Sequence, residues 1–389
     1  MLLSALVALP TALGPLLRGA WDPWAQTLVV CAAAAGAAVW LSLRVWTGFV
    51  PLPSRRSLAW IGLVAALGGL SVRWAPLGGA APFEWPTLLV GLWLFAAVAV
   101  MSKDEREVVD QAVRAAAWVL MGLAFYQRFG LCDPRPASAL FNANIWAGTV
   151  LMLLPLAVDR RDWLLAAGLL VCLWWTRSVG AWLALFAALL LTGRWRSEAR
   201  TWAALAGGLV CLVAVYDKFQ SPAVLDRVAW WKASAAMAWR HPWLGYGPGS
   251  FAAALPGFRT GGLGALHAHE YPLETAASYG VPLALVWFTG LWRQLLRARS
   301  YKRFAALAVL LQSLWDWPLA VPGNLWLFCY LAASASPETA EGVGVRWRWK
   351  APLTAAALAA GLWCVSAELG LWRVDRDKAL AVSALGEGR

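Results

Sequence analysis

The chain has 389 residues, of which 61% are hydrophobic and only 14% are charged. Soluble domains are closer to half apolar and a quarter charged, so this composition excludes an ordinary soluble enzyme and indicates an integral membrane protein. The formal net charge of +12 does not indicate nucleic-acid binding, because the lysines and arginines lie in short links between apolar runs, where they orient a protein in the bilayer.

Apolar runs of membrane-spanning length follow one another along the whole chain. The first has no basic start, so a membrane helix is expected there rather than a signal peptide. The runs predict an all-α, polytopic membrane bundle of about 11–13 transmembrane helices, forming a single membrane domain over residues 1–389. They lie near residues 2–17, 27–43, 58–73, 86–101, 112–129, 140–158, 163–176, 181–192, 201–216, 273–292, 304–318, 321–335 and 351–372.

The cationic residues between these runs are distributed unevenly. With the N-terminus in the cytoplasm, the inner links hold eighteen lysines and arginines. The outer links hold five, which are Arg18, Arg73, Arg128, Arg135 and Arg177. Because cytoplasmic links carry the excess of positive charge, the long loop at residues 217–272 is expected to lie on the outer side of the membrane.

This loop is expected to begin with a helix and continue into a glycine-rich turn. Residues 224–239 predict a helix with an apolar stripe containing Trp231 and Trp239 and with Arg227 on another face. Such a helix either lies on the outer leaflet or forms an amphipathic cap over the bundle. Gly245, Gly247 and Gly249 follow and predict a tight turn that is not helical.

All three histidines of the chain, His241, His267 and His269, lie in the same loop. A histidine facing water at a membrane surface suits a general base. An alternative is that His267, His269 and Glu270 bind zinc and that His241 completes the site. No cysteine or aspartate supports this alternative. Neither a metal nor a cofactor is expected. A third interpretation is that His241 and His267 are polar residues that only form hydrogen bonds.

Several short motifs occur in an order that is similar to that of a known family. They are Phe141-Asn142-Ala143-Asn144, Arg227 before Trp231, Pro242 to Gly247, His267-Ala268-His269 before Leu273, and Asp316-Trp317-Pro318. Together they span about residues 140–335 and resemble the O-antigen ligase and polymerase superfamily of bacterial membrane glycosyltransferases.

The resemblance implies a multi-pass protein of the bacterial inner membrane with its active site at the periplasmic face. Such enzymes move a glycan from an undecaprenyl-diphosphate carrier to a hydroxyl of lipid A-core, of a polysaccharide or of a protein. His269 matches the family histidine and would act on the acceptor hydroxyl, while Arg227 matches the loop arginine and would hold the diphosphate. Both are predicted to be catalytic.

Further residues are predicted to bind substrate or to shape the rim of the pocket. These are Arg177, Arg240, Arg259, Gly245, Gly247, Gly249, His267 and Glu270. Two of them depart from the family pattern. Glu270 replaces the asparagine that follows the family histidine, and Arg177 lies two positions before Val179, which occupies the usual arginine position.

Two rival functions belong to other classes. A transporter or flippase of the same lipid carrier usually has charges at mid-bilayer and repeated halves, and the sequence has very few such charges and no visible repeat. The second rival function is that of a non-catalytic membrane partner with the same fold. It stays open because the two departures from the family pattern, at Glu270 and at Arg177, fall on candidate site residues.

Overall fold

The computed structural model describes residues 1–78, 82–192, 205, 207–209, 222–258, 264–297, 300–335 and 340–386. Within these ranges the protein is a bundle of α-helices, which confirms the predicted all-α membrane fold. Four of the described helices are long and apolar enough to cross a membrane, and several shorter apolar helices pack among them.

The first half of the chain forms the following elements. They are α1 (Leu2–Ala8), η1 (Leu9–Leu13), α2 (Gly14–Leu16), η2 (Arg18–Ala20), α3 (Pro23–Thr47), β1 (Phe49–Leu52), α4 (Arg55–Trp74), α5 (Glu84–Val100), α6 (Lys103–Phe129), α7 (Ala143–Asp159), α8 (Trp163–Thr176) and α9 (Val179–Thr192). The predicted run at 201–216 lies mostly outside the described residues.

The second half begins with the helix that opens the long loop. Its elements are α11 (Pro222–Arg240), α12 (Phe251–Ala254), η3 (Leu255–Gly257), α13 (Tyr271–Tyr279), α14 (Val281–Arg297), α15 (Tyr301–Gln312), η4 (Pro318–Ala320), α16 (Pro322–Ala335), β2 (Glu341–Gly344) and α17 (Trp347–Gly386). β1 and β2 form an antiparallel pair in which Phe49 is opposite Gly344.

α16 forms the centre of the bundle, and every one of its residues is buried. Neighbouring helices approach it closely through small residues, as at Gly14 and Gly323, where an added Cβ would meet the other backbone. Asn324 accepts a hydrogen bond of 2.7 Å from the hydroxyl of Thr149 on α7. Packing and buried polar contacts of this kind hold membrane helices together, since lipid is as apolar as the helix surfaces.

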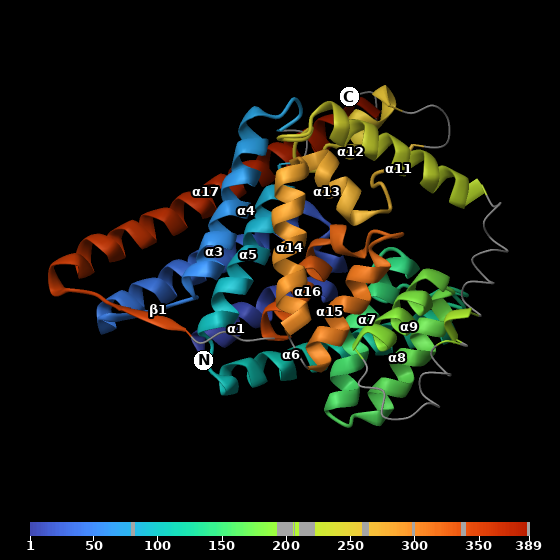
Figure 1. Ribbon diagram of the computed structural model, residues 1–389, viewed down its shortest axis with the longest axis horizontal. Coiled ribbons are helices and arrows are strands. Elements are labelled where there is room, and N and C mark those ends of the chain that lie inside the picture. Colours follow the sequence, from blue (N-terminus) through green and yellow to red (C-terminus); the bar gives the residue numbers. More distant parts are fainter. Residues whose placement is uncertain are drawn as a thin grey trace.

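Figure 1 shows α17 lying along α3 on one side of the molecule and α8 and α9 on the opposite side. α11, α12 and α13 lie together at one end, shown at the top of the view. The N-termini of α5 and α14 and the C-terminal end of α4 reach this end, because their residues bond to the loop that contains α11–α13. The long loop is therefore packed onto the ends of the bundle helices.

The single helix predicted at 273–292 is wrong, because the structure divides it into α13 and α14. The break is at Gly280, whose φ of +91° lies in the region that glycine tolerates. An added Cβ there would come within 2.3 Å of the carbonyl oxygen of Trp243. The glycine-rich turn therefore occupies the space at the break.

Candidate active site

α11 and α13 run side by side in the same direction and form the frame of the site. Trp230 in the middle of α11 stacks on His269 just before α13 begins, with ring centroids 5.1 Å apart. At the other end, the turn after α11 meets the last residues of α13. The buried face of α11 contains Ala233, Ser234 and Met237, whereas Trp239 of the predicted apolar stripe is exposed.

The glycine-rich turn closes the C-terminal end of α13. The amides of Tyr246 and Gly247 donate 2.8 Å hydrogen bonds to the carbonyls of Ala277 and Ser278, which have no partner within the helix. Gly245, Gly247 and Gly249 all have positive φ, at +64°, +116° and +59°. Gly245 and Gly247 thus lie one helix length from His269, and their contacts are with the protein's own backbone.

Replacing Gly245 by alanine is expected to lower the stability of the fold by about 2–5 kcal/mol, through left-handed backbone strain and overpacking. An added Cβ would lie 2.4 Å from the carbonyl oxygen of Ser278. Thermal unfolding of the purified protein measures the effect. Gly257→Ala is the matched control, because an added Cβ there meets nothing within 4 Å. Equal unfolding midpoints for the two variants would contradict the proposed backbone constraint.

The turn that carries the two later histidines is held by the carboxylate of Glu274. One oxygen lies 2.6 Å from Nδ1 of His267, and the other accepts a 2.7 Å hydrogen bond from the amide of Ala268. His269 follows with φ of +54°, an uncommon conformation for a residue other than glycine. Glu274 thereby fixes the backbone that presents the His269 ring.

His269 and Arg227 meet at Asp316, in the segment between α15 and η4. Oδ1 of Asp316 lies 3.3 Å from Nδ1 of His269, and Oδ2 lies 3.7 Å from a terminal nitrogen of Arg227. Arg227 also donates a 2.9 Å hydrogen bond to the carbonyl of Trp315. The Asp316 side chain is 4% exposed, against 20% for His269 and 26% for Arg227, so the carboxylate lies beneath two accessible cationic or basic groups.

The geometry assigns different tasks to the two ring nitrogens of His269. Nδ1 is buried beside the carboxylate, although the two groups are not aligned for a hydrogen bond. Catalytic hydrogen bonds are often long or poorly aligned before substrate binds. Nε2 is the ring nitrogen that is not beside this carboxylate.

Aromatic rings enclose the two histidines. His267 stacks on Trp317 with ring centroids 4.4 Å apart, and Trp317 also packs edge-on against His269. Trp21 from the N-terminal segment and Phe141 from the start of the α7 region contact Trp317. Segments far apart in the sequence therefore converge here, including the predicted Phe141 to Asn144 motif.

Several polar atoms around this cluster have no hydrogen-bond partner. They are Nε1 of Trp315, Nε1 of Trp317 and Oε1 of Gln312, all buried within the described part of the chain. Buried polar groups are nearly always paired, so a concentration of unpaired ones beside a candidate site is unusual.

Arg177 ends α8 in a left-handed conformation, with φ of +53°, and is exposed. Its chain neighbour Thr176 accepts a 3.1 Å hydrogen bond from Arg135, which also bonds to the side chain of Asn144. Gly180, at the start of α9, lies against the Trp315 ring. The α8–α9 connection is therefore next to the segment that carries Asp316.

Burial and neighbouring charges alter the pKa of two groups in the turn. Burial by itself would lower the pKa of His267, but the carboxylates of Glu274 and Glu84 outweigh it and raise the pKa above its ordinary value. Burial raises the pKa of Glu270 to about 7. Glu270 accepts a hydrogen bond from the amide of Leu273 and so caps α13, as the asparagine of the family pattern also can.

The remaining predicted residues lie elsewhere. Arg240 packs over the ring of Phe258, and His241 packs against Tyr246, both at the far end of α11 from Arg227. Thirteen residues of helix separate Arg227 from Arg240, which is roughly 20 Å. Arg259 lies outside the described residues. In the part of the chain that the structure describes, no three His, Cys, Asp or Glu side chains are grouped as metal ligands would be.

Gly249 and His267 line a cavity of about 50 Å³ beside the N-terminus of α5. Glu84 and Glu274 also line it. His269 and Arg227 are not among its lining residues, so this cavity lies behind the histidine turn rather than between the two predicted catalytic side chains.

Asp316 is the site residue that the sequence analysis did not single out. Its position in the Asp316-Trp317-Pro318 motif was the available signal. A carboxylate near a helix end also fits a capping role, so nothing in the sequence alone assigned it to Arg227 and His269.

The segment that contains α8 to α13 and the start of α14 is similar to a known family. Residues 164–288 match the family model described as O-antigen ligase, a range that includes Arg177, Arg227 and His269 and ends before Asp316. No curated protein matches the chain. The segment 164–288 is thus similar to O-antigen ligase, which supports the resemblance of the chain to the O-antigen ligase and polymerase superfamily.

Proposed function

We propose that the protein transfers or polymerises a glycan, moving it from an undecaprenyl-diphosphate carrier to an acceptor hydroxyl at the periplasmic face of the bacterial inner membrane. The observation that carries the proposal is the convergence of His269 and Arg227 on the buried carboxylate of Asp316. A base, a cation and an orienting carboxylate are the groups that such a displacement needs.

In the proposed reaction the acceptor oxygen forms a bond to the anomeric carbon of the glycan. The bond between that carbon and the phosphate oxygen breaks, and the diphosphate leaves with the electron pair. The acceptor hydroxyl gives its proton to Nε2 of His269. Asp316 stabilises the resulting imidazolium, as the carboxylate does in other carboxylate–histidine pairs.

Negative charge develops on the departing diphosphate, and Arg227 is the group proposed to stabilise it. The guanidinium has five N–H donors, and its contacts with Trp315 and Asp316 leave others for phosphate oxygens. Arg177 is exposed at the adjacent α8–α9 connection and is proposed to be a second phosphate ligand.

The orientation in the membrane is proposed from the distribution of charge. The end of the bundle opposite the histidine turn carries cationic residues, among them Arg55 and Arg56 at the start of α4 and Arg293 near the end of α14. Because cytoplasmic links carry the positive excess, this supports a periplasmic location for the candidate site.

Proteoliposomes that contain the full chain test the proposal. They are supplied with undecaprenyl-diphosphate-linked glycan and, separately, with lipid A-core, a polysaccharide end or a pilin as acceptor. Glycosylated acceptor and free undecaprenyl diphosphate are expected in equal amounts. Translocation of the donor without transfer would instead identify a flippase, and binding without turnover a non-catalytic partner.

Arg227→Gln is expected to lower the turnover number about 10²–10³-fold, the usual result of removing a donor that stabilises developing negative charge. Arg227→Lys is expected to recover only part of this loss, because an ammonium lacks the planar fork of the guanidinium. Lys232→Gln on the exposed face of the same helix is the matched control and should keep wild-type turnover. Equal activity in the Gln variant and the control would contradict the role of Arg227.

A further inference from the structure

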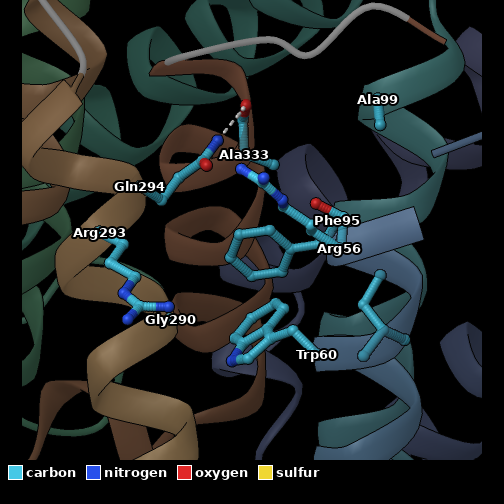
Figure 2. Close-up of a pocket in the computed structure, with 10 residues that line it drawn as sticks. Arg56, Trp60, Phe95, Ala99, Gly290, Arg293, Gln294 and Ala333 are labelled. Carbon is cyan, nitrogen blue, oxygen red and sulfur yellow. Dashed lines mark hydrogen bonds between the residues drawn. The ribbon is translucent and has the colours of Figure 1, made fainter. Parts of the chain in front are cut away.

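A crevice of about 270 Å³ lies between α4, α5, α14 and α16, away from the histidine turn. Figure 2 shows Arg56 extending toward Gln294 above the rings of Phe95 and Trp60, with Arg293 next to Gln294 on α14. The crevice therefore has a cationic mouth and an aromatic floor.

The crevice lies at the opposite end of the bundle from the candidate active site. Ser71 of α4 bonds to Leu244 beside the glycine-rich turn, and Arg56 is fifteen residues earlier on the same helix. A helix of that length spans roughly 22 Å, which is most of the hydrocarbon thickness of a bilayer. Val281 of α14 bonds to Pro242, and Arg293 is at the distant end of that helix.

The floor of the crevice is rigidly built. Trp60 donates a 2.8 Å hydrogen bond to the carbonyl of Val286 and stacks on Trp287 with centroids 5.5 Å apart. Phe95 packs edge-on against the indole ring of Trp60. Gly290 permits this approach, since an added Cβ would lie 2.0 Å from Nε1 of Trp60. The aromatic surface is thus held in place without a ligand.

The charge at the mouth is positive and uncompensated within the described part of the chain. The described ion pairs at this end join Arg160 to Glu107, Asp110 and Asp159, Lys302 to Asp110, and the N-terminal amine to Glu105. Neither Arg56 nor Arg293 takes part in one. Both arginine side chains are on exposed residues. Guanidinium groups at a membrane surface attract phosphate, which they can hold through paired N–H donors.

We propose that this crevice binds an acidic phospholipid, whose phosphate lies between Arg56 and Arg293 and whose acyl chain covers Trp60 and Phe95. The combination of two arginines at the bilayer boundary with an adjoining aromatic floor fits a lipid rather than a soluble anion. Gln294 adds a polar side chain at the same mouth. This site does not depend on the proposed glycan transfer.

Native mass spectrometry of the full chain, purified in detergent and titrated with phosphatidylglycerol, tests the proposal. Arg56→Gln with Arg293→Gln is expected to weaken retention of phosphatidylglycerol about thirtyfold, on the basis of roughly 1 kcal/mol for each arginine at a membrane surface. The control pair, Arg55→Gln with Arg346→Gln, removes equal charge from exposed residues outside the crevice and should retain the lipid.

Two further titrations separate the possible ligands. Phosphatidylcholine is expected to bind the wild-type chain weakly and to be insensitive to the variants. Inorganic phosphate is expected not to compete with phosphatidylglycerol at equal concentration. Equal retention of phosphatidylglycerol by the crevice variant and the control variant would overturn the proposal, as would equal retention of the two lipids or displacement by phosphate.

Discussion

Replacing His269 by asparagine is expected to lower the turnover number of glycan transfer about 10³-fold, within the range known for removal of a general base. The acceptor hydroxyl then has no group positioned to take its proton. Asparagine is the matched substitution because His269 has a φ of +54°, a conformation that asparagine adopts more readily than alanine does. The measured loss of turnover therefore reports the removal of the imidazole and not strain in the backbone.

Transfer to the acceptor is measured in proteoliposomes at saturating donor, and donor binding is measured separately. Binding is expected to stay close to that of the wild-type protein, since Arg227 keeps its contacts with Trp315 and Asp316. His269→Gly offers a second measurement, because glycine also accepts this φ and leaves room for free imidazole. Added imidazole is expected to restore part of the turnover. Full turnover in either variant without imidazole would exclude His269 as the base.

Replacing Asp316 by asparagine is expected to lower turnover about 10³–10⁴-fold, the order reported for the same change in a catalytic carboxylate–histidine pair. The amide cannot stabilise an imidazolium at His269, and it leaves Arg227 without its anionic partner. Asparagine has nearly the same shape, and its oxygen can still accept the 3.0 Å hydrogen bond from the amide of Trp317. The local fold of the segment is therefore retained.

Asp104→Asn is the control for this variant, because Asp104 is exposed in the first turn of α6 and far along the chain from the site residues. Both variants are compared for membrane insertion, thermal unfolding and turnover. A matching decrease of turnover in the two variants would point to a general effect of lost charge. Wild-type turnover in Asp316→Asn would remove the carboxylate from the proposed mechanism.

The helical elements were largely predictable because apolar runs in this chain coincide with helices. The run at 163–176 matches α8 at both ends, and the loop helix expected at 224–239 is found as α11. The paired strands β1 and β2 were not predicted, because each has only four residues and their partners are far apart in the chain. α17 continues through the charged residues after Trp372, which hydropathy alone did not indicate.

The candidate site was predictable only where a motif marked it. Arg227 and His269 were recognised from their place in the motif order, and the structure brings both to Asp316. Closeness in the sequence was a poor guide to the other predicted site residues, because residues at opposite ends of a straight helix lie far apart in space. Arg240 and His241 therefore lie with Phe258 and Tyr246, away from Arg227. Which side chains come together depends on where the helix ends lie in the folded bundle, and a short stretch of sequence does not determine this.

The dependence of Arg227 and His269 on Asp316 has a consequence for biosynthesis. Arg227 and its backbone acceptor Trp315 are 88 positions apart, an interval that a ribosome adding 5–20 residues per second needs roughly 4–18 s to translate. Until the segment that contains Asp316 has been translated and inserted, the guanidinium and the imidazole have no shared counter-ion. A nascent chain released before that point would consequently be inert under the proposed mechanism.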